Sequence, residues 1–162
     1  MISIEESGIE FGPFSKDDFF AIEEALQQKK LSSKGVCSVE FVVKNNNSLI
    51  FLEAKTSIPR DSDNFFTEIT EKFEHSLIVL VNALLKRNDL QNDLPANFTV
   101  NDSSLQSIKL LLVIKSVPSD YLQQLTDKLR KALKDVSVLW SIKPQNIQLI
   151  NEERAVKHNL AL

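Results

Sequence analysis

The spacing of hydrophobic residues changes along the chain and predicts an alternation of helices and strands. Segments 36–44 and 48–55 are rich in the β-branched and aromatic residues that favour strands, and the asparagines between them are typical of a turn. Segments 64–87 and 119–134 instead repeat their apolar residues every three to four positions, as a helix with one buried face does. The remaining predicted elements are a short strand within 2–11, a helix over 15–30, a strand at 107–116, and one or two last strands in VSVLWSIK and NIQLIN.

The resulting order, approximately αβββαβαβ, predicts a single α/β domain that spans residues 1–162. We expect a mixed central β-sheet flanked by helices. The nearly continuous apolar run SIKLLLVIKS supports this arrangement, because a strand covered on both faces needs apolar side chains on both. The chain has no internal repeat and no linker long enough to separate two domains, and its 162 residues suit one hydrophobic core.

The predicted hairpin carries charged residues where a half-buried sheet should be apolar. If Asn46 and Asn47 form a two-residue turn, the pairing of the strands brings Glu40 directly opposite Glu53. Strand alternation places Lys55 on the same face. Facing carboxylates destabilise a sheet, and a divalent cation with oxygen ligands would offset their repulsion. The alternative is a salt-bridged, solvent-facing side, although the surrounding runs SVEFVV and LIFLEAK are too apolar for a well-exposed face.

A further carboxylate lies on the first predicted helix. Glu23 falls near the middle of the apolar face of this helix, between Phe19 and Leu26. A carboxylate in such a position is either paired or functional. The paired interpretation needs a lysine from the sheet, for which Lys55 is a candidate, and both interpretations stay open.

The other helices carry their charges on the side opposite the apolar face. On the helix predicted at 64–87, the polar side consists of Glu68, Glu71, Lys72 and Glu74. The helix predicted at 119–134 contains the most basic segment of the chain, formed by Lys128, Arg130, Lys131 and Lys134. Such a segment is either a solvated face or the rim of a nucleic-acid site.

Composition narrows the classes of function. The three glycines form no GxGxxG or Walker pattern, which excludes a glycine-rich phosphate-binding loop. The single cysteine, Cys37, excludes internal disulfides and zinc sites built from cysteines, and its position in the strand pattern predicts a small buried hydrophobe. His75 and His158 are far apart in the sequence, which argues against a histidine-rich metal site. A net charge of −3 argues against indiscriminate nucleic-acid binding.

The same features bear on location. The N-terminal sequence MISIEESGIE is acidic and interrupted by a glycine, unlike a signal peptide. The longest apolar run, LIVLVNALL, is too short to span a bilayer. A lone cysteine fits a reducing compartment. We therefore expect a cytoplasmic protein with no membrane association.

The charged residues resemble the motif of the PD-(D/E)XK nuclease superfamily, which includes restriction endonucleases. The resemblance covers roughly residues 15–116 and rests on Glu40, the triplet EAK that runs from Glu53 to Lys55 on the next strand, and the helical Glu23. It implies a restriction-endonuclease-like αβββαβ core. It also implies that Glu40 and Glu53 are catalytic ligands of Mg²⁺ or Mn²⁺ and that Lys55 is the catalytic lysine. Glu23 would match the helical acid that some members use to bind the metal or a metal-bound water.

Two functions from different classes fit these residues. The first is a divalent-metal-dependent nuclease that hydrolyses phosphodiester bonds, with DNA as the expected substrate. Its candidate substrate contacts are Lys44, Thr56, Ser57 and Arg60, with Lys109 and Lys115 as further candidates. The second is a nuclease-fold protein with little or no activity that acts as a binding or scaffold subunit, which the acidic composition favours. The resemblance also implies a homodimer or a subunit of a larger complex.

Overall fold

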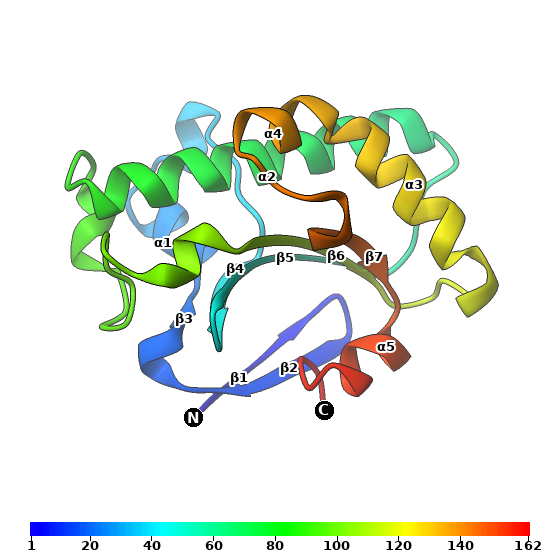
Figure 1. Ribbon diagram of the computed structural model, residues 1–162, viewed down its shortest axis with the longest axis horizontal. Coiled ribbons are helices and arrows are strands. Elements are labelled where there is room, and N and C mark those ends of the chain that lie inside the picture. The colour runs from blue at the N-terminus through cyan, green and yellow to red at the C-terminus, as the bar shows by residue number, and fades with distance from the viewer.

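The computed structural model describes residues 1–162 and is built around a five-stranded mixed sheet (Figure 1). The strands lie in the order β3-β4-β5-β6-β7; the pairs from β3 to β5 are antiparallel and those from β5 to β7 are parallel. Their bounds are β3 Phe19–Phe20, β4 Phe41–Asn45, β5 Ser48–Lys55, β6 Ile108–Ile114 and β7 Ile147–Ile150. The predicted α/β class, with a mixed sheet and helices, is confirmed.

Both faces of the sheet are covered. One face packs against four helices, α1 Ile22–Gln28, α2 Ser62–Leu84, α3 Leu122–Ala132 and α4 Lys134–Leu139. The other face packs against the hairpin of β1 Ile2–Glu6 and β2 Ile9–Phe14 and against α5 Glu152–Lys157. Neighbouring residues of β5 show the two layers, because Phe51 belongs to the apolar cluster beneath the helices and Leu52 to the cluster beneath the hairpin.

The predicted hairpin turn is present. Asn45 pairs with Ser48, and the register continues without a bulge to the pair of Phe41 and Leu52. Asn46 has a φ of +53°, the left-handed conformation that such a turn needs and that asparagine tolerates. Strand β5 has the predicted bounds, 48–55.

The strand predicted at 36–44 is shorter than expected, because segment 36–40 is not part of the sheet. Its backbone bonds instead to side chains of α2: the Cys37 amide donates to His75 Nδ1 at 3.2 Å and the Val39 amide donates to Ser76 Oγ at 2.9 Å. Cys37 is half-buried beside His75 rather than enclosed in the core, so the prediction of a small buried hydrophobe is corrected.

The helix predicted at 15–30 begins later. Ser15 caps only a short 3-10 turn, Lys16–Asp18, and β3 follows because its two phenylalanines pair with Val42 and Val43 of β4. The helix α1 then starts at Ile22. The strand predicted within 2–11 is the hairpin of β1 and β2 instead.

The prediction of a strand in VSVLWSIK is wrong, because this sequence forms most of α4 and the turn after it. Its Val136 packs into the core beneath the helices, whereas Val138 and Leu139 are exposed. Trp140 ends the helix and is half-buried. The strand predicted in NIQLIN is β7. The other short 3-10 turns are Ser32–Lys34, Asp89–Asn92, Ser103–Gln106, Ser119–Tyr121 and Pro144–Asn146.

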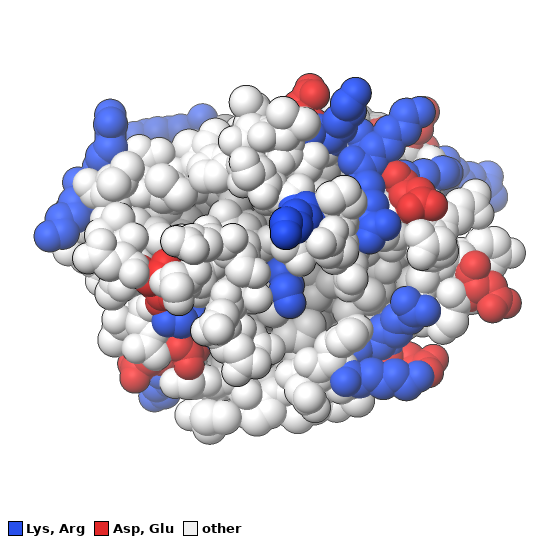
Figure 2. All heavy atoms as spheres, viewed as in Figure 1, with Lys and Arg blue, Asp and Glu red and all other residues white.

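The surface seen in Figure 2 carries its lysine and arginine side chains unevenly, with most of them over α3 and around α5. Arg130 and Lys131 in the last turn of α3, and Arg154 and Lys157 in α5, belong to these elements. None of the helices combines the length and the apolarity that crossing a membrane requires.

Candidate functional site

Glu53 is the centre of the candidate site. It lies near the end of β5 and its side chain is 0% exposed. One carboxylate oxygen, Oε1, lies 2.7 Å from Lys55 Nζ and accepts a hydrogen bond of 2.8 Å from Lys72 Nζ. The other oxygen, Oε2, is buried and has no hydrogen-bond partner. Burying a carboxylate oxygen without a partner is unfavourable, so this atom is available for a ligand.

Glu40 lies beside Glu53 as the hairpin register predicts. The last pair of the hairpin is Phe41 with Leu52, and Glu40 and Glu53 are the next residues on the two segments. Glu40 is 9% exposed, and its Oε1 is 4.0 Å from Lys55 Nζ. Burial, the charge of Glu53 and a hydrogen bond with Glu23 together raise the pKa of Glu40 to about 8. Glu40 therefore binds a proton more tightly than an exposed carboxylate does, and its hydrogen bond with Glu23 places this proton between the two side chains.

Glu23 and Glu6 complete a group of four acids. Glu23 lies in the first turn of α1 and is half-buried, whereas its neighbour Glu24 is exposed. Glu6 is the last residue of β1. Burial and the charges of Glu23 and Glu53 raise the pKa of Glu6, and a hydrogen bond with Glu40 opposes this rise. The four carboxylates therefore come from four different places in the chain and interact with one another.

Lys72 reaches this group from α2, although sequence analysis placed it on the solvent side of the helix. Its side chain is largely buried and points to the sheet. Burial lowers the pKa of Lys72, but the charge of Glu53 and the hydrogen bond to it outweigh burial, and the net pKa is raised. The helical period puts Lys72 next to Phe73 and one turn after Ile69, at the edge of the apolar face. That edge position is the only sequence signal for its role.

Glu6 was also missed by sequence analysis. The residues of β1 alternate between half-buried and exposed, and Glu6 has the same parity as Ile2 and Ile4. An acid that continues an apolar strand face is a signal of the same kind as Glu53 in β5. The position of Glu6 at the end of β1 then decides its role. The turn that follows brings Ser7 Oγ to the Ala54 carbonyl at 3.0 Å, which places Glu6 near the end of β5.

Three of the predicted substrate contacts lie beyond the end of β5. Thr56, Ser57 and Arg60 are exposed and follow Lys55 in the chain, and the Thr56 hydroxyl donates to the Ser7 carbonyl, next to Glu6, at 3.5 Å. The Thr56 backbone is fixed by Ser116, whose Oγ donates to the Thr56 carbonyl at 2.7 Å.

The structure does not bring Lys44 to the acid group. It lies in β4, four residues after Glu40 in the chain and next to the hairpin turn, and forms an ion pair with Asp102. The hydrogen bond from Lys44 lowers the pKa of Asp102 to about 2. Lys109 pairs with Ile50, toward the same end of the sheet as Lys44. Lys115 lies at the acid end, where its Nζ donates to the Gly8 carbonyl and is 4.0 Å from Glu152.

No protein-family model matches the chain, and the comparisons with curated proteins and with solved structures also found no match.

Proposed function

We propose that this protein is a divalent-metal-dependent phosphodiesterase that cleaves nucleic acid, with DNA as the expected substrate. The observation that carries the proposal is the environment of Glu53, a fully buried carboxylate with one oxygen unpartnered, surrounded by Glu6, Glu23 and Glu40. A group of like charges gathered around a buried acid raises the free energy of the folded chain unless a cation or a proton compensates it.

The donor set fits Mg²⁺ or Mn²⁺. Both ions prefer oxygen ligands, and Mg²⁺ in particular is bound by one or two carboxylates together with water and substrate phosphate. Glu40 and Glu53 would hold the ion, with Glu23 and Glu6 as the further acids of the group. A bound ion would polarise the phosphate and lower the pKa of a water molecule. The raised pKa of Glu40 suits this role, because a proton takes the place of part of the cationic charge when no ion is bound.

The two lysines have different tasks in this proposal. Lys72 lies largely within the fold and holds Glu53 in position through its hydrogen bond. Lys55 has a side chain that is 33% exposed, so its ammonium group reaches both Glu53 and solvent. From there it can donate a hydrogen bond to a phosphate oxygen or to the attacking water, which stabilises the charge that develops during hydrolysis. Thr56, Ser57 and Arg60 supply hydroxyl and guanidinium donors for the flanking phosphates.

The resemblance to PD-(D/E)XK nucleases supports the same function. Glu53 and Lys55 lie on β5, Glu40 immediately precedes β4 of the same hairpin, and Glu23 lies on the preceding helix α1, an order similar to that of the motif. The restriction-endonuclease-like core is part of this proposal. A homodimer or a larger complex would follow from the same resemblance.

A second candidate is a binding or scaffold subunit without catalysis. The observation that favours it is the pairing of Glu53 with both Lys55 and Lys72, because two ammonium groups already compensate the buried charge. In that case the network is structural, and removal of the lysines or acids would change only stability.

Calorimetric titration of Mn²⁺ and Mg²⁺ into the wild type, Glu53→Gln and Glu24→Gln distinguishes the two candidates. Glu24 is the matched control, since it follows Glu23 in α1 but is exposed. We expect the wild type and Glu24→Gln to bind the metal and Glu53→Gln not to bind it. We also expect the wild type and Glu24→Gln to cleave DNA when Mn²⁺ is present. Circular dichroism establishes that each variant is folded. Metal binding without cleavage of DNA or RNA, or no binding at all, would favour the scaffold.

A further inference from the structure

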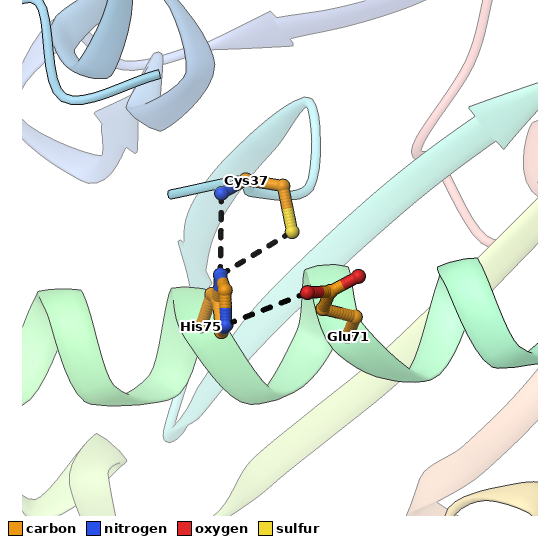
Figure 3. A group of neighbouring side chains, drawn as sticks. All are labelled: Cys37, Glu71 and His75. Atoms are coloured by element: carbon orange, nitrogen blue, oxygen red, sulfur yellow. Dashed lines mark hydrogen bonds and ion pairs between the residues drawn. The ribbon is translucent and has the colours of Figure 1, made fainter. Parts of the chain in front are cut away.

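A second group of side chains lies at the surface of α2, next to Lys72, and includes two residues of this helix and one of the segment before β4. Glu71 and His75 project from successive turns of this helix, and Cys37 approaches them from the segment before β4 (Figure 3). Cys37 Sγ is 3.4 Å from His75 Nδ1, and His75 Nε2 is 3.9 Å from Glu71 Oε1. One ligand atom of each residue can be chosen so that all three lie within 4.8 Å of one another.

We propose that Cys37, Glu71 and His75 bind a thiophilic divalent cation, with Zn²⁺ as the best fit. Thiolate, imidazole and carboxylate are the side-chain ligands of zinc, which binds three protein groups and leaves the fourth position to water in open sites. The same set does not suit Mg²⁺, which prefers oxygen ligands only. This inference is independent of the proposed phosphodiesterase activity and rests on different residues.

The distance between Cys37 and His75 is close to that of a zinc site, and Glu71 is near enough to complete it. On a tetrahedral ion, a sulfur and a nitrogen ligand are about 3.6 Å apart and a nitrogen and an oxygen about 3.4 Å. An imidazole binds one ion through a single nitrogen, and the Cys37 Sγ to His75 Nδ1 distance of 3.4 Å is near the first value. The 3.9 Å distance joins Glu71 to the other nitrogen, Nε2, so the carboxylate has to turn toward Nδ1 to join the same ion, starting from ligand atoms that lie within 4.8 Å of one another. The Glu71 side chain is 58% exposed, so its carboxylate can make this turn without displacing packed atoms.

Binding would change one hydrogen bond. The Cys37 amide now donates to His75 Nδ1, so a cation at that nitrogen takes the place of the amide hydrogen. The thiol proton passes to solvent when sulfur becomes a ligand. The cation would then hold segment 36–40 to α2 by two bonds to side chains, in addition to the 2.9 Å bond from the Val39 amide to Ser76.

This position gives the site a structural task. Glu40 is three residues after Cys37. Lys72, which bonds to Glu53, lies between Glu71 and His75 on α2. A cation that joins Cys37 to α2 would fix the backbone on which Glu40 is carried. The zinc site is therefore a positioning site and contacts none of the four acids of the candidate active site.

Co²⁺ replaces Zn²⁺ in the first test, because a cobalt–thiolate bond gives a charge-transfer absorption in the near ultraviolet. Co²⁺ is titrated into metal-free full-length protein with excess Mg²⁺ present, which occupies sites made of carboxylates alone. We expect the absorption to saturate at one equivalent, to be absent from Cys37→Ser, and to need at least about tenfold more Co²⁺ in His75→Ala. Glu68→Gln, an exposed carboxylate one turn before Glu71 on the same helix, is the matched control and should behave as the wild type.

The second measurement uses only the unaltered chain, so it does not depend on the folding of any variant. The rate at which iodoacetamide alkylates Cys37 is followed by mass spectrometry with and without Zn²⁺. We expect the rate to fall about tenfold when free Zn²⁺ is near ten times its Kd. A rate that does not change with Zn²⁺, a wild-type Co²⁺ spectrum without the charge-transfer absorption, or an equal absorption in His75→Ala would each overturn the proposal.

Discussion

Lys72 of α2 and Glu53 of β5 are joined across the boundary between helix and sheet, with Lys72 Nζ 2.8 Å from Glu53 Oε1. Lys55 Nζ lies 2.7 Å from the same oxygen, and Oε2 has no partner. Both cations therefore act on one half of the carboxylate. The second oxygen is thereby left without compensation, and it is the position that a cation would take in the proposed function.

The first prediction concerns Lys72. In Lys72→Met the buried Glu53 loses one of its two ammonium partners, and we expect the free energy of unfolding to fall by roughly 2 kcal/mol. Urea unfolding followed by fluorescence measures the change. Lys157→Met removes an exposed ion pair with Glu153 and is the control, for which we expect no measurable effect. Equal stabilities of Lys72→Met and the wild type would show that the Lys72 bond does not compensate the buried charge.

The second prediction concerns the pH dependence of stability without metal. The pKa of Glu40 is raised from 4.5 to about 8 on folding, so the folded state binds the proton more tightly than the unfolded state. Stability is therefore greatest below about 4.5 for this group and falls as the pH rises, until it levels above about 8. The slope is at most about 1.4 kcal/mol per pH unit for one proton.

Urea unfolding at several pH values between these limits tests this expectation. In Glu40→Gln the side chain does not titrate, so most of the slope should disappear, and only the smaller effect of the raised Glu6 pKa should remain. A wild-type stability that is constant or rises over this range would show that Glu40 is ionised in the folded protein.

The third prediction is that Glu6→Gln has effects of opposite sign on stability and on metal binding. Without metal, removing one of four neighbouring acids reduces repulsion, and we expect stabilisation by about 1 kcal/mol. With Mn²⁺, loss of a nearby negative charge should weaken binding by roughly tenfold. Thermal unfolding and calorimetry measure the two effects. If Glu6→Gln destabilises the metal-free protein, Glu6 is a structural residue and not part of a metal site.

The fourth prediction compares neighbouring residues of α1. We expect Glu23→Gln to weaken Mn²⁺ binding by about tenfold and Glu24→Gln to leave it unchanged. The reason is that Glu23 is half-buried and bonds to Glu40, whereas Glu24 is exposed and accepts a bond from Gln28 at 3.0 Å. The two substitutions alter the helix charge equally, so a general electrostatic effect would weaken binding in both variants alike.

The hairpin and its charges could be predicted because local rules determine them. The turn at Asn46 sets the register, and the register alone brings Glu40 level with Glu53. The placement of Glu23 followed from helical periodicity, although the helix begins at Ile22 and not at Ser15. These inferences depend on residues close together in the chain.

Features that depend on distant parts of the chain could not be predicted in the same way. Lys72 and Glu6 join the site only because α2 and the β1–β2 hairpin pack at the same end of β5, which no local pattern reveals. The sequence VSVLWSIK has strand-forming residues, yet Val136 packs into the core as part of a helix. Here tertiary packing outweighs local preference.

Residues 71–76 of α2 contact two separate groups. Within this one turn and a half, Lys72 bonds to Glu53, His75 accepts from Cys37 and Ser76 accepts from Val39. Each residue added to or removed from a helix turns everything beyond it by about 100°. One inserted residue between the helix cap at Asp61 and position 71 would therefore break all three contacts at once, while leaving every charged side chain in the sequence. The length of this first part of α2 is thus as much a determinant of the site as the identity of its acids.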